Sequence, residues 1–373
     1  MKKSFADILN GIDERRDRKL AAKLPEWAAA EGLQIPSSLA LEQCSSTAAA
    51  LYKAEMVRRE TAGVPDPVVC DITGGLGVDS WAFSQIAGKV FYHERDAELS
   101  AAVEINYKLL GVNNVIIKNE SVDSSTELPC CDLIFADPAR RGDTGNKVFL
   151  LEDCTPDILQ LLPSLWKRCS TILLKLSPMA DISMLYKRLG PECTEIHTVG
   201  KDGECKEILC LLKKGRKGPC RITVADLDTG GRLTFYQDEE REAVPHYKLP
   251  APGDILFEPS AALMKAGCFR LICSRFGIRK LSSSTNLYTA GDVPDGLAAL
   301  GKVFKVLEVL PFGNTTFKEA GRRYPRAEVT ARNVPLSSDE LRKKMGVRSG
   351  SDAHIFGCTA LDARYLIICQ ATR

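Results

Sequence analysis

A run of glycines between two acidic residues is the part of this sequence whose residue types most directly suggest chemistry. The segment Asp71-Ile-Thr-Gly-Gly-Leu-Gly-Val-Asp79 follows a short apolar run and precedes residues with helical spacing. Glycine lets the backbone turn tightly and approach a bound molecule, because no side chain stands between them. A turn of this kind between a strand and a helix predicts a site for a nucleoside cofactor.

Three details favour S-adenosylmethionine over a dinucleotide. Asp71 ends the expected strand, where its carboxylate can meet a cationic amino-acid group directly or through water. Ser80 stands where the dinucleotide motif has its third glycine. The next expected strand is followed by Glu94, whose carboxylate can accept both ribose hydroxyls. A structural turn and a nicotinamide site are the alternatives. The expected cofactor residues of the motif are Asp71, Thr73, Gly74, Gly75, Gly77, Asp79 and Glu94.

The loop after the third expected strand is the predicted neighbour of the adenine. It contains Asn119 and Ser121, whose polar side chains can hydrogen-bond a base. Either residue can equally serve as a turn residue that bonds its own backbone. Both interpretations stay open at this point.

The catalytic candidate is Asp137-Pro138-Ala139-Arg140, which follows the apolar strand Leu133–Ala136. Open α/β sheets bind their ligands at the carboxyl ends of the strands, so this segment is expected beside the glycine turn. An Asp oxygen and a nearby carbonyl can accept the two N–H groups of an amine and hold its nitrogen in line with a methyl group. Arg140 and Arg141 can hold a phosphate or form a surface ion pair. Lys175 follows a later strand and is expected at the same rim of the sheet.

The order of the elements predicts a Rossmann-like, doubly wound α/β sheet. Strands are expected at Val68–Ile72, Lys89–His93, Val115–Lys118, Leu133–Ala136 and Thr171–Leu176, with helices between them. Such alternation predicts a parallel sheet with right-handed crossovers. We expect an N-terminal helical segment at 1–60, a catalytic domain at 61–215 and a connecting β segment at 216–253. Two small α+β units follow at 254–300, with one helix over Ser260–Phe276, and at 301–373.

Composition limits the classes of protein that this chain can belong to. Hydrophobic residues make up 45% and charged residues 26% of the 373 residues, which is typical of a globular protein. No apolar stretch approaches the roughly 18 residues of a membrane helix, and no secretory signal is visible, so we expect a cytoplasmic protein without membrane contact. The spacing of the 14 cysteines fits neither zinc ligands nor a disulfide framework, so we expect buried thiols and no metal.

The charge is unevenly distributed along the chain. Residues 251–373 contain 18 Lys and Arg against 11 Asp and Glu, while residues 1–250 contain 32 against 37. A basic C-terminal part is typical of a nucleic-acid-binding appendage, although an ordinary solvated surface has the same composition.

The chain resembles known methyltransferases at two levels. The segment from Val68 to Asn146 is similar to the amino-methyltransferases, and especially to trimethylguanosine synthase and related RNA guanine-N2 enzymes. Those enzymes have Asp/Asn/Ser-Pro-Pro-aromatic at the catalytic loop, whereas this chain has Ala139 for the second proline and Arg140 for the aromatic residue. The missing aromatic residue leaves the methylated atom open, with Phe149 or Tyr92 as substitutes for the base-stacking ring.

Taken whole, the chain resembles bacterial class I methyltransferases with C-terminal ferredoxin-like and THUMP-like domains. The similar segments include Gln43–Thr47, Lys175–Pro178, Gly203–Glu207, Phe257–Gly267 and Ala331–Pro335. The resemblance implies S-adenosyl-L-methionine as cofactor, a ferredoxin-like unit at 254–300 and a THUMP-like unit at 301–373 that binds RNA, either tRNA or rRNA. The expected phosphate-contacting residues, with Arg141 and Lys175 nearer the catalytic loop, are Arg332, Arg342, Lys343, Lys344 and Arg348.

The sequence therefore predicts a methyltransferase that modifies a base amino group in RNA. Two alternatives remain: a methyltransferase that acts on DNA or on a protein, and a protein that binds the cofactor and RNA without turnover.

Overall fold

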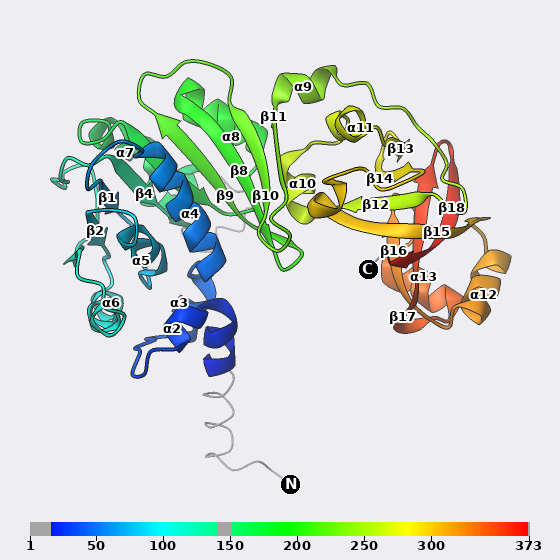
Figure 1. Ribbon diagram of the computed structural model, residues 1–373, viewed down its shortest axis with the longest axis horizontal. Helices are drawn as coiled ribbons and strands as arrows, with labels where there is room; N and C mark the ends of the chain where they lie inside the picture. The colour runs from blue at the N-terminus through cyan, green and yellow to red at the C-terminus, as the bar shows by residue number, and fades with distance from the viewer. Residues whose placement is uncertain (1–15, 141–150, 372–373) are drawn as a thin grey trace, which may run out of the picture. The chain divides into compact units, whose positions relative to one another are not determined.

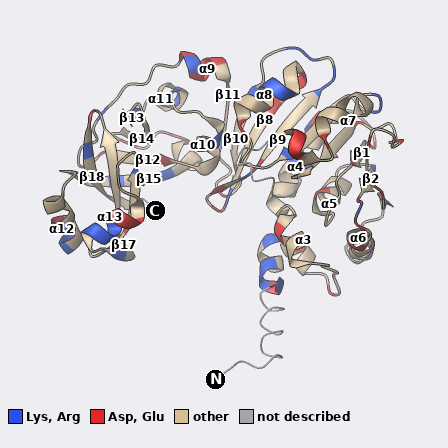
Figure 2. Cartoon of the chain, turned by 180° about the vertical axis from the view of Figure 1, so that it is seen from behind, with Lys and Arg blue, Asp and Glu red and all other residues tan. Residues whose placement is uncertain are grey.

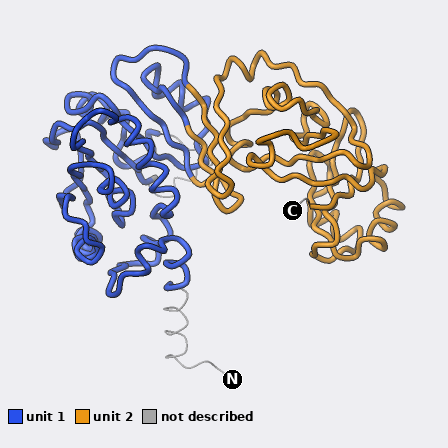
Figure 3. The backbone as a smooth tube through the Cα atoms, in the orientation of Figure 1, with its two compact units in different colours: residues 1–196, 207–220 blue, residues 197–206, 221–373 orange. Residues whose placement is uncertain are grey.

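The computed structural model describes residues 16–140 and 151–371. The chain forms two compact units, shown in Figure 3. Unit 1 comprises residues 1–196 and 207–220, and unit 2 comprises residues 197–206 and 221–373. The strands β8 (Cys193–Lys201) and β9 (Glu204–Lys213) contribute residues to both units.

Unit 1 is built on a mostly parallel sheet with the strand order β8-β9-β7-β4-β1-β2-β3 (Figure 1). The parallel strands are β1 (Val68–Asp71), β2 (Lys89–His93), β3 (Val115–Lys118), β4 (Leu133–Ala136) and β7 (Thr171–Leu176). The apolar side chains of β1, β4 and β7 are buried almost without interruption, as expected for strands covered on both faces, whereas those of the edge strand β3 are half-buried.

The strands β1 and β4 run parallel, but the side on which the chain adds further strands changes between them. From β1 the chain builds β2 and β3 on one side, and from β4 it builds β7 on the other. Right-handed crossovers therefore place α5 (Val78–Ser84) and α6 (Ala97–Leu109) on one face of the sheet, with α7 (Ile158–Leu165) and α8 (Ile182–Leu189) on the opposite face. Ligands bind at such a switch point, outside the carboxyl ends of the two strands.

The doubly wound α/β fold is confirmed, with one correction to the sheet. Four of the predicted strands, β2, β3, β4 and β7, have the predicted bounds. The sheet is not wholly parallel, because β9 runs antiparallel to β7. The strand β8 and the helix α8 were not predicted from the sequence.

Short helices precede the sheet of unit 1, and short elements follow its fourth strand. The helices are α2 (Pro25–Ala28), α3 (Ser38–Gln43) and α4 (Thr47–Glu60). The hydroxyl of Ser46 caps α4 by accepting a hydrogen bond from the Ala49 amide. After β4 come β5 (Ala139–Arg140), η1 (Leu151–Asp153) and β6 (Cys154–Thr155), and η2 (Gly190–Glu192) follows α8. Within the described ranges, no helix has the length and apolar character that crossing a membrane requires.

Unit 2 contains a seven-stranded sheet in the order β13-β14-β12-β15-β18-β17-β16. Its strands are β12 (Ile255–Pro259), β13 (Arg279–Ser282), β14 (Thr285–Ala290), β15 (Gly301–Pro311), β16 (Arg326–Arg332), β17 (Arg348–Ala360) and β18 (Ala363–Ala371). Alternate residues of β18 enter two separate cores, since Ile367 packs in one and Ile368 in the other. The sheet is therefore covered on both faces.

Helices and a hairpin complete unit 2. The strands β10 (Arg221–Asp226) and β11 (Arg232–Tyr236) form an antiparallel hairpin within the segment expected to be a connecting β segment, and β10 lies next to β8. The helices are α9 (Gln237–Glu242), α10 (Ala261–Ala266), α11 (Leu271–Phe276), η3 (Leu297–Leu300), α12 (Asn314–Arg323) and α13 (Ser338–Met345). The core that contains Phe317 and Leu341 attaches α12 and α13 to one face of the sheet.

One expectation for unit 2 needs correction. The single helix expected over Ser260–Phe276 is two helices, because Gly267 ends α10 in a left-handed conformation (φ 76°) that other residues rarely adopt. The segments expected at 254–300 and 301–373 share one sheet, in which β12 pairs with β15. The helix α12 was not predicted.

Candidate functional site

The loop after β1 is held together by the carboxylate of Asp71. Its Oδ2 accepts a hydrogen bond from the Ser80 hydroxyl (2.6 Å), and its Oδ1 accepts one from the Thr73 amide (3.0 Å). Asp71 is fully buried, and burial raises its pKa to about 7 although both hydrogen bonds lower it. This corrects the expectation that Asp71 faces a cofactor, because its oxygens serve donors inside the turn.

Two glycines of the motif are required by the packing around the turn. A Cβ on Gly74 would lie 2.0 Å from the ring of Tyr92. Gly77 has a positive φ of 80° where α5 begins, and a Cβ there would lie 2.6 Å from the hydroxyl of Tyr107. The hydroxyl of Tyr92 donates to the carbonyl of Gly75 (2.6 Å), so the turn rests on a buried aromatic ring. Tyr92 is thus unable to serve as the base-stacking ring that the resemblance suggested.

Glu94 follows β2, and its carboxylate is fixed by two backbone donors. The amide of Gly75 donates to Oε2 (2.7 Å), and the amide of Asp96 donates to Oε1 (2.8 Å). Each carboxylate oxygen can accept a second hydrogen bond. The glycine turn and Glu94 are therefore locked together, and the carboxylate keeps accepting capacity for a ligand.

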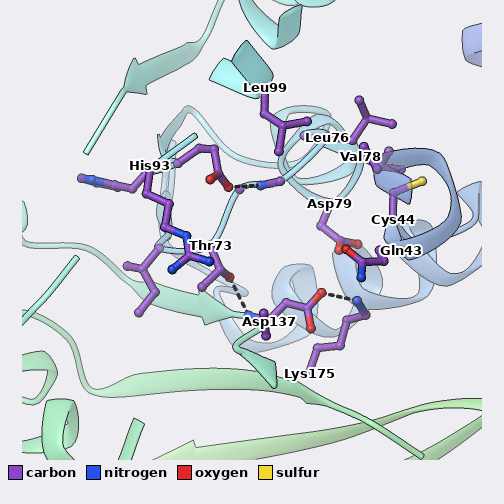
Figure 4. Close-up of a pocket in the computed structure, with 18 of the residues that line it drawn as sticks. Gln43, Cys44, Thr73, Leu76, Val78, Asp79, His93, Leu99, Asp137 and Lys175 are labelled. Atoms are coloured by element: carbon purple, nitrogen blue, oxygen red, sulfur yellow. Dashed lines mark hydrogen bonds and ion pairs between the residues drawn. The ribbon is translucent and has the colours of Figure 1, made fainter. Parts of the chain in front are cut away.

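A cavity of about 620 Å³ opens where the loops after β1, β2 and β4 meet (Figure 4). Its size lies within the range of small-molecule and cofactor sites. The turn contributes Thr73 and the three glycines, while Leu76, Val78, Leu99 and Val122 supply apolar surface. Its charged lining residues are Asp79, Glu94, Arg95, Glu120, Asp137 and Lys175.

Asp137 lies at the end of β4 and forms an ion pair with Lys175 at the end of β7 (Figure 4). Its backbone amide donates to the hydroxyl of Thr73 (2.6 Å), which ties the catalytic loop to the glycine turn. Burial lowers the pKa of Lys175, but the carboxylates of Asp137, Asp79 and Glu207 outweigh burial and raise it above its ordinary value. Lys175 is therefore a cation, and it is paired with the candidate catalytic carboxylate of Asp137. The sequence analysis predicted a contact with RNA for this lysine.

The rest of the catalytic loop is only partly described. Pro138 is buried and Ala139 lines the cavity, and β5 is anchored by antiparallel pairing with β6. For Arg140 only the backbone in β5 is placed, while Arg141 and Phe149 lie outside the described residues.

The two residues predicted beside the adenine are placed differently. Ser121 lines the cavity. The side-chain amide of Asn119 donates to the carbonyl of Glu94 (2.8 Å), and Asn119 lies outside the cavity wall. Its observed contact therefore orients the strand end that carries Glu94.

Several residues of the cavity wall were missed by the sequence analysis. The end of α3 and the turn between α3 and α4 contribute Gln43, Cys44 and Ser45 to the cavity wall. Ser45 donates a hydrogen bond to Asp79 (2.8 Å), and the buried Lys53 of α4 forms an ion pair with Asp79 (3.2 Å). His93 also lines the wall, with its Nδ1 3.1 Å from Glu120 Oε1. A lysine at a buried helix position has no distinct sequence signal. The segment Gln43–Thr47 was singled out for its resemblance to the family, without a role in the cavity.

The five basic residues predicted to contact phosphates in unit 2 do not form one patch. Arg332 and Arg348 lie at opposite ends of β16, because Arg348 pairs in register with Arg326 and the seven residues of β16 span about 20 Å. Arg332 forms an ion pair with Glu258 (2.8 Å), and Arg342 forms one with Asp339 (2.5 Å).

The remaining residues of that prediction gather with two arginines that the sequence analysis missed. The last turns of α12 and α13 are basic and meet each other, since a Cβ on Gly321 would lie 1.8 Å from the carbonyl of Met345. Figure 2 shows Lys and Arg concentrated along these two helices. All five residues of this basic cluster are exposed, and none has an ion-pair partner among the described residues: Arg322, Arg326, Lys343, Lys344 and Arg348.

Comparison with known proteins identifies the C-terminal part and one full-length relative. Residues 256–295 match a ferredoxin-like domain, and residues 301–371 match a THUMP domain-like family. No curated protein matches the sequence. A protein from Porphyromonas gingivalis W83 that is assigned as a methyltransferase has 31% sequence identity and a TM-score of 0.84. The similarity covers 96% of this chain and 89% of that one.

Other solved structures are similar over about half of the chain. The 16S rRNA N2 G1207 methyltransferase of T. Thermophilus has 16% identity and a TM-score of 0.33, covering 50% of this chain and 45% of its own. The ribosomal protein L11 methylase of Lactobacillus delbrueckii subsp. bulgaricus has 19% identity and a TM-score of 0.32, covering 44% of this chain and 78% of its own.

Proposed function

Since the chain belongs to the methyltransferase family that includes the Porphyromonas gingivalis protein, and carries ferredoxin-like and THUMP-like domains at its C-terminal end, we propose that it methylates a base amino group in RNA. The proposed methyl donor is S-adenosylmethionine. In this proposal residues 61–215 form the catalytic domain, and residues 301–373 bind the tRNA or rRNA substrate.

The residues of the cavity fit S-adenosylmethionine. Gly75 lines the cavity, and no protein atom beyond its chain neighbours lies within 4 Å of the position that its Cβ would take, so its backbone is open to a ligand. Glu94 would accept the ribose hydroxyls, and Leu99 with Val122 and Ser121 would surround the adenine. Asp79 and the backbone of the glycine turn would hold the amino-acid end. When bound, the donor supplies a methyl group on a sulfonium, ready for attack by a nucleophile.

Asp137 would position the methyl acceptor. Its Oδ2 is engaged by Lys175, so its Oδ1 is the oxygen left to accept one N–H bond of the incoming amine. The carbonyl of Pro138 would accept the second N–H bond and orient the nitrogen lone pair toward the donor. The role of the loop is then chiefly to align the acceptor, which is an effective contribution to rate when the reacting atoms are held in line.

The observation that carries this proposal is that Glu94 and Asp137 line one cavity from the loops after β2 and β4, the two strands that flank β1. Lys175 pairs with Asp137, and Thr73 joins the catalytic loop to the glycine turn. The basic cluster of unit 2 supports an RNA substrate, because unpaired cations on one surface release counterions when they meet phosphates.

Transfer of a tritiated methyl group from labelled donor to total RNA tests the proposal. Asp137→Ala should lower the transfer rate about hundredfold or more, because the acceptor loses its positioning group, while donor affinity stays within a few-fold of wild type. Asp238→Ala, a change at an exposed aspartate on α9, is the matched control and should leave transfer unchanged. Label that enters only DNA or protein would support those substrates instead. Donor binding without any transfer would support a silent binding protein.

A further inference from the structure

A buried network of four polar side chains lies directly behind the cavity wall. Lys53 on α4 is fully buried and donates hydrogen bonds to both oxygens of Glu207 (2.8 and 3.0 Å) and to the hydroxyl of Ser45 (3.0 Å). It also forms the ion pair with Asp79 (3.2 Å), whose other oxygen accepts the hydrogen bond from Ser45 (2.8 Å). The ammonium group of Lys53, on α4, therefore contacts residues of β9, α5 and the α3–α4 turn.

Stability alone does not account for this network. Taking charges out of water is costly, and replacing a buried ion pair with well-packed apolar residues is often neutral or stabilising. Here one lysine and two carboxylates are buried together, and burial raises the pKa of Glu207 even though Lys53 lowers it. The desolvation cost of these groups therefore favours a role beyond holding α4 on the sheet.

Asp79 is the charged member of the network that lines the cavity, next to Ser45. It lines the cavity, whereas Lys53 and Glu207 do not. Its Oδ1 is buried without a hydrogen bond from any described residue, although the charge of Lys53 is nearby. Figure 4 shows Asp79 beside Gln43, at the part of the wall formed by the α3–α4 turn. The cavity there is lined by a carboxylate whose position is set from behind.

We propose that Lys53 is a positioning residue for the methyl donor, which acts through Asp79 to fix a carboxylate against the ammonium of the donor's amino-acid end. The inference rests on the proposed function, because it assigns Glu94 to the ribose and so leaves the Asp79 end of the cavity for the amino acid. In this proposal α4 and the α3–α4 turn belong to the cofactor site.

Two ligands that differ only at the amino-acid end separate this role from a general structural one. S-adenosylhomocysteine has the nucleoside, the sulfur and the amino acid, whereas 5′-methylthioadenosine has no amino acid. Calorimetric titration of the full chain should show that Lys53→Met weakens S-adenosylhomocysteine about tenfold and leaves 5′-methylthioadenosine within about twofold of wild type. A variant whose cavity is merely distorted loses affinity for both ligands.

The path through Asp79 is tested by a double-mutant cycle. Asp79→Asn should weaken S-adenosylhomocysteine by a similar factor, and the double variant should be no weaker than Asp79→Asn alone, because Lys53 contacts the cavity wall only through Asp79 and through Ser45, which itself donates to Asp79. Arg59→Met is the matched control. It removes a cation of the same helix that pairs with Glu195 (2.7 Å), away from the cavity, and should leave both affinities unchanged.

Ser45→Ala keeps the test decisive if Lys53→Met does not fold. It removes the Ser45 hydrogen bond to Asp79, and we expect a loss of about threefold for S-adenosylhomocysteine alone. Equal losses for the two ligands, or no loss in either variant, would overturn the role of Lys53. Wild-type protein that binds neither ligand would overturn the proposed function itself.

Discussion

In unit 1 the two lysines next to the cavity, Lys53 and Lys175, are largely buried and paired with carboxylates, whereas in unit 2 the basic cluster at the ends of α12 and α13 and at the starts of β16 and β17 is exposed. Lys53 and Lys175 each contact a carboxylate, and their side chains are 0% and 12% exposed. The basic cluster has no such partners among the described residues. Lysine and arginine side chains therefore have different roles in the two units.

The difference follows from what each site has to hold. A small cationic ligand in a cavity requires carboxylates in fixed positions, and buried ion pairs supply that order at a cost in desolvation. A phosphate backbone is long and hydrated, so solvated cations at roughly correct spacing suffice. Substitutions in unit 1 should thus change stability and pH dependence, and those in unit 2 should change salt dependence.

The largest expected effect is the pH dependence of stability caused by Asp71. Its pKa of about 7 in the folded protein lies above the ordinary value of 3.8. A carboxyl group with a raised native pKa favours folding below its unfolded pKa, and this contribution is lost as the pH rises through the native pKa. Relative to Asp71→Asn, the free energy of unfolding of wild type should fall by about 2–4 kcal/mol between pH 4 and pH 7.

Urea unfolding of both proteins at several pH values between about 4 and 8 measures this difference. Above about pH 7 the difference should become constant, because the folded protein then also has an ionised Asp71. A difference that is already constant at pH 5 would mean that burial does not control this carboxyl group. The contrast between the two units would lose its strongest support.

A smaller effect separates an ion pair of the cavity from one on the surface. Lys175→Met leaves the carboxylate of Asp137 without its partner, and should lower the free energy of unfolding by about 1–2 kcal/mol, since solvent partly screens Asp137. Arg342→Met breaks the exposed pair with Asp339 on α13 and should cost at most about 0.5 kcal/mol. Denaturant unfolding of the two variants under one condition gives the comparison directly. Equal costs would contradict it.

The sequence predicted those features that depend on local pattern. Continuous apolar runs gave the strands β2, β3, β4 and β7, and the glycine segment with Glu94 located the cavity, because these signals lie within a few neighbouring residues. The helix α12 was missed because its buried face, Phe317, Ala320 and Gly321, has only one large apolar side chain among ten residues.

Features that depend on contacts between distant segments were not predictable. Lys53 contacts Glu207 across 154 residues of sequence, and no local pattern marks either residue as buried. Asp71 was correctly placed beside the turn, but its direction depends on Ser80, which turned out to donate a hydrogen bond to it. Arg332 and Arg348 were predicted to lie in one patch, but they lie at opposite ends of β16. Their spacing in the sequence does not reveal this separation.

The smallest expected effect concerns the basic cluster and its salt dependence. Changing Lys343, Lys344 and Arg348 together to alanine should lower RNA affinity about tenfold at low salt and reduce the log–log salt slope by about two to three, because each phosphate contact contributes about one unit. The double change of Arg332 and Arg342 to alanine is the matched control. Both arginines are paired within the protein, so its slope should change by less than about one unit. Filter binding over a salt series measures both, and the opposite ranking would place the RNA contacts on the paired arginines instead.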